Sequence, residues 1–188
     1  GMDGLRQILQ SCYYIGYMAF GVTFVIITGG IDLSLGSLML CSALVGCCAY
    51  SVWGWPLWIA LILILVIGAL FGLFNGVMVA KLKLPPFIAT LGTQMITLGF
   101  GSIISKVRTM YFPSVGSNDE WFRSVFYING QFPTGVLWLL GAFAIAWFLL
   151  NKTSFGRYVF AIGSNEEAAR LSGVKVDRYK IAVYVVCG

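Results

Sequence analysis

The sequence lacks histidine and has few charged residues. Because none of the 188 residues is histidine, the commonest general base and the commonest metal ligand are both missing. Charged residues make up 10% of the chain, against about 25% in an ordinary soluble domain. Hydrophobic residues make up 59%, and a soluble fold of this size cannot hide so much apolar surface, since about 30% of the chain surface stays in contact with water. The composition therefore indicates a membrane protein.

The chain also lacks the motifs of enzymes and metal proteins. Its five cysteines lie in apolar stretches without a CxxC pair, so we expect small packed side chains and no metal site. There is no GxxxxGKS/T phosphate loop, and a Ser/His/Asp triad is impossible without histidine. The net charge of +5 is dispersed among apolar runs rather than gathered on one face. We expect no enzyme, no cofactor bound by this chain and no nucleic-acid partner.

Long uncharged runs predict membrane-spanning helices. About 20 apolar residues cross a hydrocarbon core of ~30 Å as a helix. The run from Leu33 to Ala80 is long enough for two spans, and the turn between them is predicted at Trp53-Gly54-Trp55-Pro56. We predict an all-α polytopic fold with about five spans and the start of a sixth near Lys180. The five spans cover about 9–29, 34–52, 57–80, 87–105 and 134–150.

The lysine and arginine residues predict the orientation in the membrane. If the segment 152–180 faces the cytoplasm, eight basic residues lie inside and four outside. Loops rich in lysine and arginine normally face the cytoplasm, so we assign 152–180 and the loop with Lys81 and Lys83 to that side. The loop 106–133 is then external.

A glycine recurs at every fourth position of the predicted span 57–80. Gly68, Gly72 and Gly76 lie on one face of that helix, where they allow a neighbouring backbone to approach closely. We interpret this stripe as a helix-packing surface.

The segment around Asp32 is a first candidate for function. Gly29 and Gly30 interrupt an apolar run, and an ionisable group near membrane depth is commonly functional. Asp32 is equally well interpreted as an interfacial cap for the following helix, whose positive end a carboxylate stabilises. The sequence leaves both interpretations open.

A second candidate is the polar face of the span 87–105. Thr90, Thr93, Gln94 and Thr97 recur at three- and four-residue spacing, and Asn75 is a similar polar residue on the preceding span. In lipid such a face turns inward, either to hydrogen-bond a partner helix or to line a hydrated path.

A third candidate is a short helix in the segment 152–180. Ser164 and Glu167 fit a capping box, and Gly173 suits the left-handed position that ends a helix. The predicted helix covers about 165–172, too short to span a membrane and too polar to lie in lipid. Its defined ends favour docking on a cytoplasmic partner over a simple connector.

Three stretches are distinctive in combination: VIITGGIDLSLGS (25–37), FGLFNGVMVAKLKLPPFIATLGT (71–93) and FGRYVFAIGSNEEAARLSGVKVDRYKIAVY (155–184). They resemble the permease subunits of bacterial ATP-binding cassette (ABC) importers for sugars, of the ribose, xylose and galactoside type. That superfamily also includes branched-chain amino acid permeases. Glu167-Ala168-Ala169 with Gly173 also matches the EAA-xxx-G pattern of ABC importer permeases, whose short cytoplasmic helix inserts into the ATPase subunit.

The resemblance implies a transport subunit rather than an enzyme. It implies a multi-pass protein of the bacterial inner membrane that pairs with a second permease subunit, identical or different, and with an ABC ATPase that binds ATP and Mg²⁺. A periplasmic or lipoprotein sugar-binding protein would deliver a monosaccharide such as ribose. Such permeases have roughly ten spans, so we expect residues 1–188 to be a partial permease domain.

The resemblance also assigns roles to residues. Coupling to the ATPase falls on Ser164, Asn165, Glu166, Glu167, Ala168, Ala169, Arg170, Leu171 and Gly173. The substrate path candidates are Asp32, Asn75, Thr90, Thr93 and Gln94. The external loop 106–133 is expected to touch the binding protein, with an aromatic belt at the membrane interface as the alternative. Its aromatic residues are Tyr111, Phe112, Trp121, Phe122, Phe126 and Tyr127.

Other functions are compatible with parts of this pattern. An ion-coupled secondary transporter would use Asp32 and the broken Gly29-Gly30 region as an ion site, but it leaves the helix 165–172 unexplained. A permease of the same superfamily for a non-sugar solute, such as a branched-chain amino acid, is a second alternative. A membrane scaffold subunit without a substrate is a third.

Overall fold

The computed structural model describes residues 2–110, 118–119, 121–125, 127–128 and 132–188. In this part of the chain all elements are helices apart from one short antiparallel pair, in which Tyr127 faces Pro133 and Ile128 faces Phe132. The predicted all-helical fold class is therefore confirmed. The elements are α1 (Met2–Ile27), α2 (Leu35–Ser51), α3 (Leu57–Ala80), α4 (Pro86–Ser105), α5 (Trp121–Ser124), β1 (Tyr127–Ile128), β2 (Phe132–Pro133), α6 (Gly135–Lys152), α7 (Ser154–Ser164), α8 (Glu166–Leu171) and α9 (Val176–Cys187).

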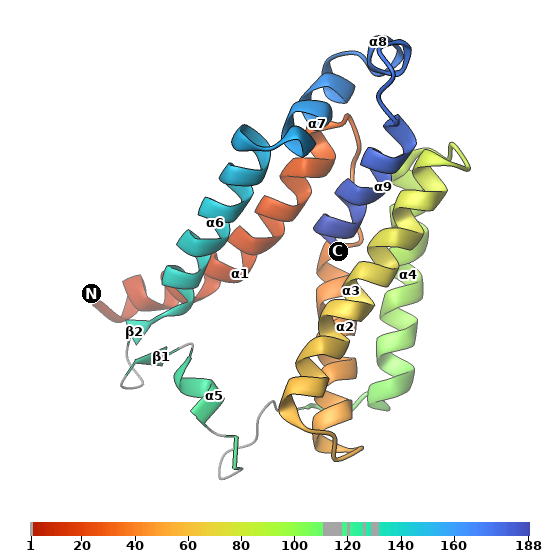
Figure 1. The fold of residues 1–188 in the computed structure, drawn as a ribbon. Coiled ribbons are helices and arrows are strands. Elements are labelled where there is room, and N and C mark those ends of the chain that lie inside the picture. Colours follow the sequence, from red (N-terminus) through yellow and green to blue (C-terminus); the bar gives the residue numbers. More distant parts are fainter. Residues whose placement is uncertain (1, 111–117, 120, 126, 129–131) are drawn as a thin grey trace.

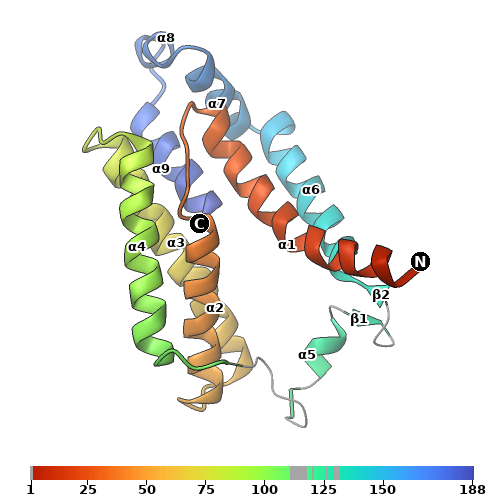
Figure 2. The same ribbon diagram turned by 180° about the vertical axis from the view of Figure 1, so that it is seen from behind.

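The long helices form two groups joined by α9. Helices α1 and α6 lie side by side, α2, α3 and α4 form the other group, and α9 lies between the two (Figures 1 and 2). A cluster of buried apolar side chains fills the space where α9 meets α1, α3, α4 and α7. It consists of Phe24, Val25, Val79, Ala89, Val159, Val183 and Tyr184. The position of α9 therefore decides how the two groups of helices are held together.

Three helices in the described part are long and apolar enough to cross a membrane, namely α3, α4 and α6. Two shorter apolar helical segments accompany them, Cys12–Ile27 within α1 and Leu35–Ser51, which is α2. At 1.5 Å per residue, the 17 residues of α2 extend about 25 Å, at the lower limit for a span. The five predicted spans therefore all coincide with helices, three of which are both long and apolar enough to cross a membrane within the described residues.

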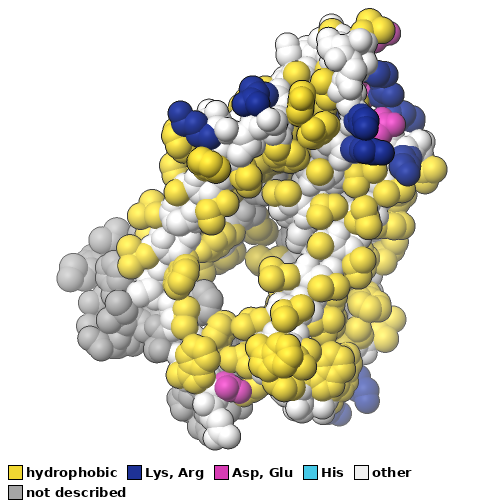
Figure 3. Space-filling model, viewed as in Figure 1, with side chains coloured by type: hydrophobic (Ala, Val, Ile, Leu, Met, Phe, Trp, Pro, Cys, Tyr) yellow, Lys and Arg dark blue, Asp and Glu magenta, His cyan; other side chains and the backbone are white. Residues whose placement is uncertain are grey.

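Basic side chains gather at one end of the molecule. Helices α7 and α8 lie at that end, together with the turn between α3 and α4 (Figure 1). The space-filling view shows lysine and arginine side chains concentrated there, while hydrophobic side chains cover the flanks (Figure 3). This is the end that the sequence predicts to face the cytoplasm.

Helix α7 is absent from our sequence-based prediction, which placed only one short helix between Lys152 and Lys180. Its start is capped by Thr153, whose hydroxyl accepts a hydrogen bond from the Gly156 N–H. Gly156, Val159 and Ile162 are buried at three-residue spacing, so one face of α7 packs against the bundle. The face was overlooked because it begins with a glycine, which carries no apolar side chain.

The predicted external loop contains α5 and the β1–β2 pair. Asp119, just before α5, accepts a hydrogen bond from the Tyr50 hydroxyl near the end of α2. Of the six aromatic residues that we expect to touch a binding protein, Trp121 and Phe122 lie in α5 and Tyr127 lies in β1. The other three lie outside the described residues: Tyr111, Phe112 and Phe126.

Candidate functional site

The connection between α1 and α2 runs into the bundle instead of across its end. After α1 ends near α7, the chain descends in a non-helical segment to the level of the α9 end (Figure 2). Gly29 adopts the left-handed backbone conformation with φ +76°, which favours glycine. A Cβ atom at Gly30 would lie 2.8 Å from the Tyr184 hydroxyl oxygen of α9, so a side chain there would collide with it. The two glycines thus allow the chain to turn and to pass close to α9.

Asp32 lies in this segment and is 5% exposed. Its Oδ1 accepts hydrogen bonds from the Ser34 N–H at 2.9 Å and from the Ser34 hydroxyl at 2.6 Å. Its Oδ2 is buried and has no hydrogen-bond partner in the described part of the chain. The N-cap of α2 is Ser34, so Asp32 does not cap the helix as the cap interpretation expects. With one oxygen it instead holds the turn that leads into α2. The other oxygen is left available inside the bundle, as the functional interpretation requires.

A chain of hydrogen bonds connects Asp32 to α3 and α4. The Asn75 side-chain amide of α3 donates to the Ser34 hydroxyl at 2.9 Å, and the Thr93 hydroxyl of α4 donates to Asn75 Oδ1. Asn75 and Thr93 are fully buried. Thr93 donates to Asn75, Asn75 donates to Ser34, and Ser34 donates to Asp32. The Asp32 carboxyl group is therefore the final acceptor of a chain that begins on α4 and passes through α3.

Helix geometry gives the depth of this polar network. Asn75 lies five residues before the end of α3 at Ala80, and Thr93 lies seven residues after the start of α4 at Pro86. At 1.5 Å per residue these positions are about 8–10 Å inside the helix ends. Non-helical backbone is tolerated at such depth only where protein buries it or a cavity adjoins it.

The structure brings together some of the predicted path residues and not others. Asp32, Asn75 and Thr93 share the network, whereas the Thr90 hydroxyl donates to the Pro86 carbonyl of its own helix. Gln94 is only partly buried and makes no hydrogen bond with them. Ser34 and Ser37, which we did not select, are buried, and Ser37 accepts a hydrogen bond from Thr97 at 2.9 Å. Their roles depend on contacts with α3 and α4, which lie far away in the sequence.

The glycine stripe of α3 faces α9. Cβ atoms at Gly68 and Gly72 would collide with the carbonyl oxygens of Gly188 and Tyr184, and one at Gly76 would lie 2.8 Å from the Ile181 Cα. The three glycines thus allow direct contact between the backbones of α3 and α9.

The short helix α8 begins one residue later than the predicted capping box. Asn165 is its N-cap, and the Asn165 side-chain oxygen accepts a hydrogen bond from the Ala168 N–H at 2.9 Å. Ser164 ends α7 instead, so its role as the N-cap was a wrong prediction. Serine and asparagine are both good N-caps, and the extended backbone that separates α7 from α8 falls at Asn165. Gly173 follows α8 with φ +84°, the conformation that the sequence predicts.

One face of α8 is fixed to the bundle and the rest is exposed. Ala169 is buried against Ile162 of α7 and Val176 of α9. Leu171 is 85% exposed, an unusual position for a leucine, and Glu167 is exposed without an ion pair in the described part of the chain. The helix therefore has defined ends, a fixed inner face and an exposed apolar side chain.

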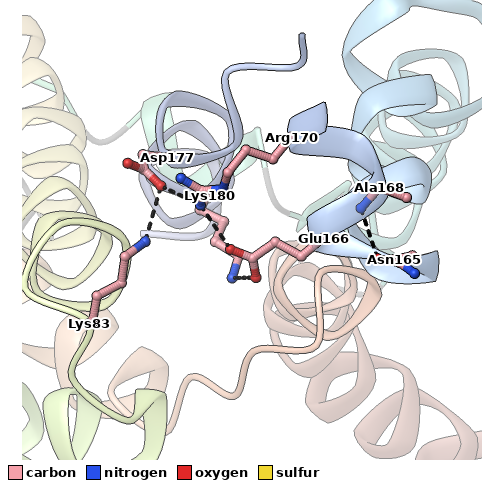
Figure 4. A network of polar contacts seen from close by, with 7 residues as sticks. All are labelled: Lys83, Asn165, Glu166, Ala168, Arg170, Asp177 and Lys180. Atoms are coloured by element: carbon pink, nitrogen blue, oxygen red, sulfur yellow. Dashed lines mark hydrogen bonds and ion pairs between the residues drawn. The ribbon is translucent and has the colours of Figure 1, made fainter. Parts of the chain in front are cut away.

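A chain of five alternating charges connects α8 to its neighbours (Figure 4). On α8, the Arg170 guanidinium contacts Glu166 and also Asp177 of α9, both at 3.2 Å. Asp177 is shared with Lys83 of the α3–α4 turn at 3.2 Å. Glu166 in turn pairs with Lys180 of α9, the least exposed member of the network.

The two acids in this network have lowered pKa values. The hydrogen bond from Lys180 lowers the pKa of the Glu166 carboxyl, partial burial opposes it, and the Lys180 charge and Arg170 reinforce it. At Asp177, burial raises the pKa, but the hydrogen bonds and charges of Lys83 and Arg170 outweigh it. Both acids are therefore held in their charged forms.

Replacing Glu166 with glutamine is expected to lower stability at neutral pH but not in acid. A carboxyl whose pKa is lowered by folding stabilises the protein above its unfolded pKa of about 4.3, and this contribution is lost as the pH falls through the folded value. Because the pairs are half-exposed, the effect at pH 7 should stay below about 1 kcal/mol. Thermal unfolding midpoints between pH 7 and about pH 3 measure it. Glu167→Gln is the matched control, and an equal, pH-independent effect of both variants would contradict the prediction.

Comparison with known proteins identifies the family. The family described as "Branched-chain amino acid transport system / permease component" matches residues 4–188. The chain is 43% identical over 188 residues to the ribose import permease protein RbsC of Bacillus subtilis, covering 98% of this chain and 56% of the relative. It is 38% identical over 188 residues to the fructose import permease protein FrcC of Rhizobium meliloti, covering 98% of this chain and 52% of the relative.

A third relative is the L-arabinose transport system permease protein AraH of Escherichia coli, 40% identical over 174 residues, which are 92% of this chain and 51% of the relative. The chain thus spans about half the length of the curated relatives it matches. No solved structure matches it significantly. These matches, which include sugar import permeases, confirm the resemblance found in the sequence. The chain belongs to the family of branched-chain amino acid transport system permease components.

Proposed function

We propose that this chain is part of the permease subunit of an ABC importer that moves a monosaccharide across the bacterial inner membrane. A separate ATPase subunit would drive alternating access, and an external sugar-binding protein and a second permease subunit would complete the assembly. The relatives named above as importers of ribose, fructose and arabinose support a sugar as the substrate.

The observation that carries this proposal is α8. It is a capped helix of six residues outside the apolar bundle, and it lies at the end where the basic side chains gather (Figure 3). Leu171 provides an exposed apolar anchor beside Glu167, and the inner face is fixed by Ala169. A helix fixed on one side and exposed on the other can insert into a cleft of a partner and move as a rigid body with it.

The buried network gives the proposed substrate path its chemistry. A sugar presents hydroxyl groups, and these are bound by carboxyl, amide and hydroxyl side chains. Asp32, Asn75 and Thr93 provide all three kinds of group at membrane depth.

We expect Leu171→Asp to release the ATPase from the permease. In the complex the Leu171 side chain would be buried against the ATPase. Loss of such an apolar anchor together with insertion of a charge typically weakens an interface by about 2 kcal/mol or more, which is about 30-fold. Co-purification of the ATPase with the tagged full-length permease measures the effect.

Leu82→Asp is the matched control for this experiment. Leu82 lies in the α3–α4 turn at the same end of the molecule and is 64% exposed, but it is not part of α8. Equal ATPase recovery with Leu171→Asp and Leu82→Asp would contradict docking through α8, and transport driven by an ion gradient without any ATPase would overturn the proposed function.

A further inference from the structure

We propose that Lys83, Asp177 and Lys180 are positioning residues that tie the docking helix α8 to the α3–α4 turn, so that movement of α8 is passed to the helices that carry the polar network. This inference rests on the proposed function, because it assigns a mechanical role to the same helix. The three residues lie outside α8 and belong to the five-charge chain Lys180–Glu166–Arg170–Asp177–Lys83.

The geometry of this chain makes Arg170 its centre. Arg170 reaches both acids, Glu166 within α8 and Asp177 on α9, each at 3.2 Å (Figure 4). Lys83 and Lys180 then neutralise the same two acids from outside α8. The α3–α4 turn, which is distant in the sequence, is therefore connected to the neighbouring helices α8 and α9 through shared partners.

Lys83 is held in an unusual backbone conformation at the end of this chain. It has φ +55°, a left-handed conformation that residues with a Cβ atom rarely adopt. The flanking backbone is closed by hydrogen bonds from Leu82 to Val77 and from Leu84 to Met78. The turn that places the Lys83 ammonium group beside Asp177 is therefore defined by its backbone as well as by the ion pair.

The turn leads directly into the helices of the polar network. Lys83 lies three residues before Pro86, where α4 begins, and three residues after Ala80, where α3 ends. Asn75 on α3 and Thr93 on α4 share one hydrogen bond. Helix α9 gives a second connection, because the Tyr184 hydroxyl donates to the Ile31 carbonyl at 3.5 Å. A displacement of α8 can therefore reach the Asp32 segment in two ways, through the α3–α4 turn with Lys83 or through α9 with Tyr184.

Because the Lys83–Asp177 ion pair is exposed, transport coupling is a more informative measurement than stability. Side chains of Lys83 and Asp177 are 57% and 40% exposed, and isolated surface pairs contribute little to stability. We therefore expect removal of Lys83 or Asp177 to leave folding and ATPase binding nearly unchanged. The effect should appear in coupling, which is the amount of sugar imported for each ATP hydrolysed.

The experiment uses the full-length permease with its ATPase and binding protein in lipid vesicles. Lys83→Met and Asp177→Asn are each expected to lower the sugar imported per ATP about threefold to tenfold. The double variant should be no worse than the more affected single variant, because both remove the same contact. Lys83→Arg, which keeps the charge, should restore coupling.

Lys81→Met is the matched control. Lys81 lies in the same turn, is exposed, and makes no ion pair in the described part of the chain. Coupling in Lys83→Met equal to that in Lys81→Met would overturn the inference, and so would fully additive losses in the double variant. Either result leaves the proposed function intact if Leu171→Asp still releases the ATPase. If Leu171→Asp retains the ATPase, docking through α8 fails, and the inference fails with it.

Discussion

Replacing Gly72 with leucine is expected to separate α9 from α3 and to prevent the bundle from assembling. A Cβ atom at Gly72 would already collide with the Tyr184 carbonyl oxygen and lie 3.0 Å from the Val185 Cα. These are backbone atoms of the last turn of α9, so no side-chain rotation can relieve the contact. The rest of the leucine side chain would enter the same space.

The expected loss is at the upper end of what overpacking causes, about 3 kcal/mol or more. Helix α9 holds Val183 and Tyr184, which belong to the main buried cluster, so its displacement would open the contact between the two groups of helices. The yield of monodisperse full-length protein in detergent and its thermal unfolding midpoint measure the effect. Gly72→Ala should give a smaller loss in the same direction.

Gly99→Leu on α4 is the control for this prediction. Gly99 is exposed, and a Cβ atom there would meet no other atom within 4 Å. Both variants add the same apolar side chain to an apolar helix, and they differ only in what faces it. Similar folding yields for Gly72→Leu and Gly99→Leu would contradict the view that the glycine stripe of α3 determines where α9 packs.

The predicted helix boundaries agree with the structure where single residues determine them. Pro56 and the first charged residue after the long apolar run mark the span 57–80, and α3 has the same bounds. Pro85 and Pro86 similarly place the start of α4. Proline fixes the backbone angle φ, and a charged residue ends an apolar run. Both signals are local, so they can be recognised in the sequence without knowledge of the fold.

The missed or shifted elements depend on contacts that the sequence does not display. Helix α7 continues through Ser164, so the extended backbone at Asn165 makes Asn165 the N-cap of α8. Asn165 and Ser164 have similar intrinsic capping ability, so the local sequence does not choose between them. Just before this point, Gly163 lies against the Ile27 carbonyl oxygen of α1, a contact between distant segments. Local propensity identified the existence of α8 and its final glycine, but not its first residue.

The two polar networks were only partly predictable for the same reason. Asn75 and Thr93 were selected by polarity within apolar spans, and they lie together in the structure. Ser34, which connects them to Asp32, is separated from Asn75 by 41 positions, and Lys83 is separated from Asp177 by 94. Ordinary serine and lysine residues gain their roles there from the helix arrangement alone, which no spacing rule reveals.

Changing Asp32 to asparagine is expected to abolish most transport while the protein still folds. Asparagine keeps the oxygen that accepts hydrogen bonds from the Ser34 backbone and hydroxyl. It replaces Oδ2, the buried oxygen without a partner in the described part of the chain, with an NH₂ group. The available acceptor becomes a donor, and a sugar hydroxyl that donates to the carboxyl would lose its partner.

The size of the effect follows from the lost hydrogen-bond acceptor. A buried polar group left without its partner costs about 1–3 kcal/mol, so sugar uptake should fall at least about fivefold. Uptake by the full-length permease in vesicles, measured beside its thermal unfolding midpoint, separates transport from stability. Asp32→Ala should lower both, because it also removes the acceptor for Ser34 at the start of α2.

Ser42→Ala provides the comparison for a buried polar group outside the network. The Ser42 hydroxyl donates to the Met39 carbonyl of its own helix at 3.1 Å, so its loss should leave both uptake and folding close to the unmodified protein. If Asp32→Asn also transports at the unmodified rate, Asp32 only holds the turn before α2, and the path must be assigned to other residues. Loss of uptake with an unchanged unfolding midpoint requires a role for the second oxygen that the turn does not explain, because the oxygen that accepts from Ser34 is still present in the variant.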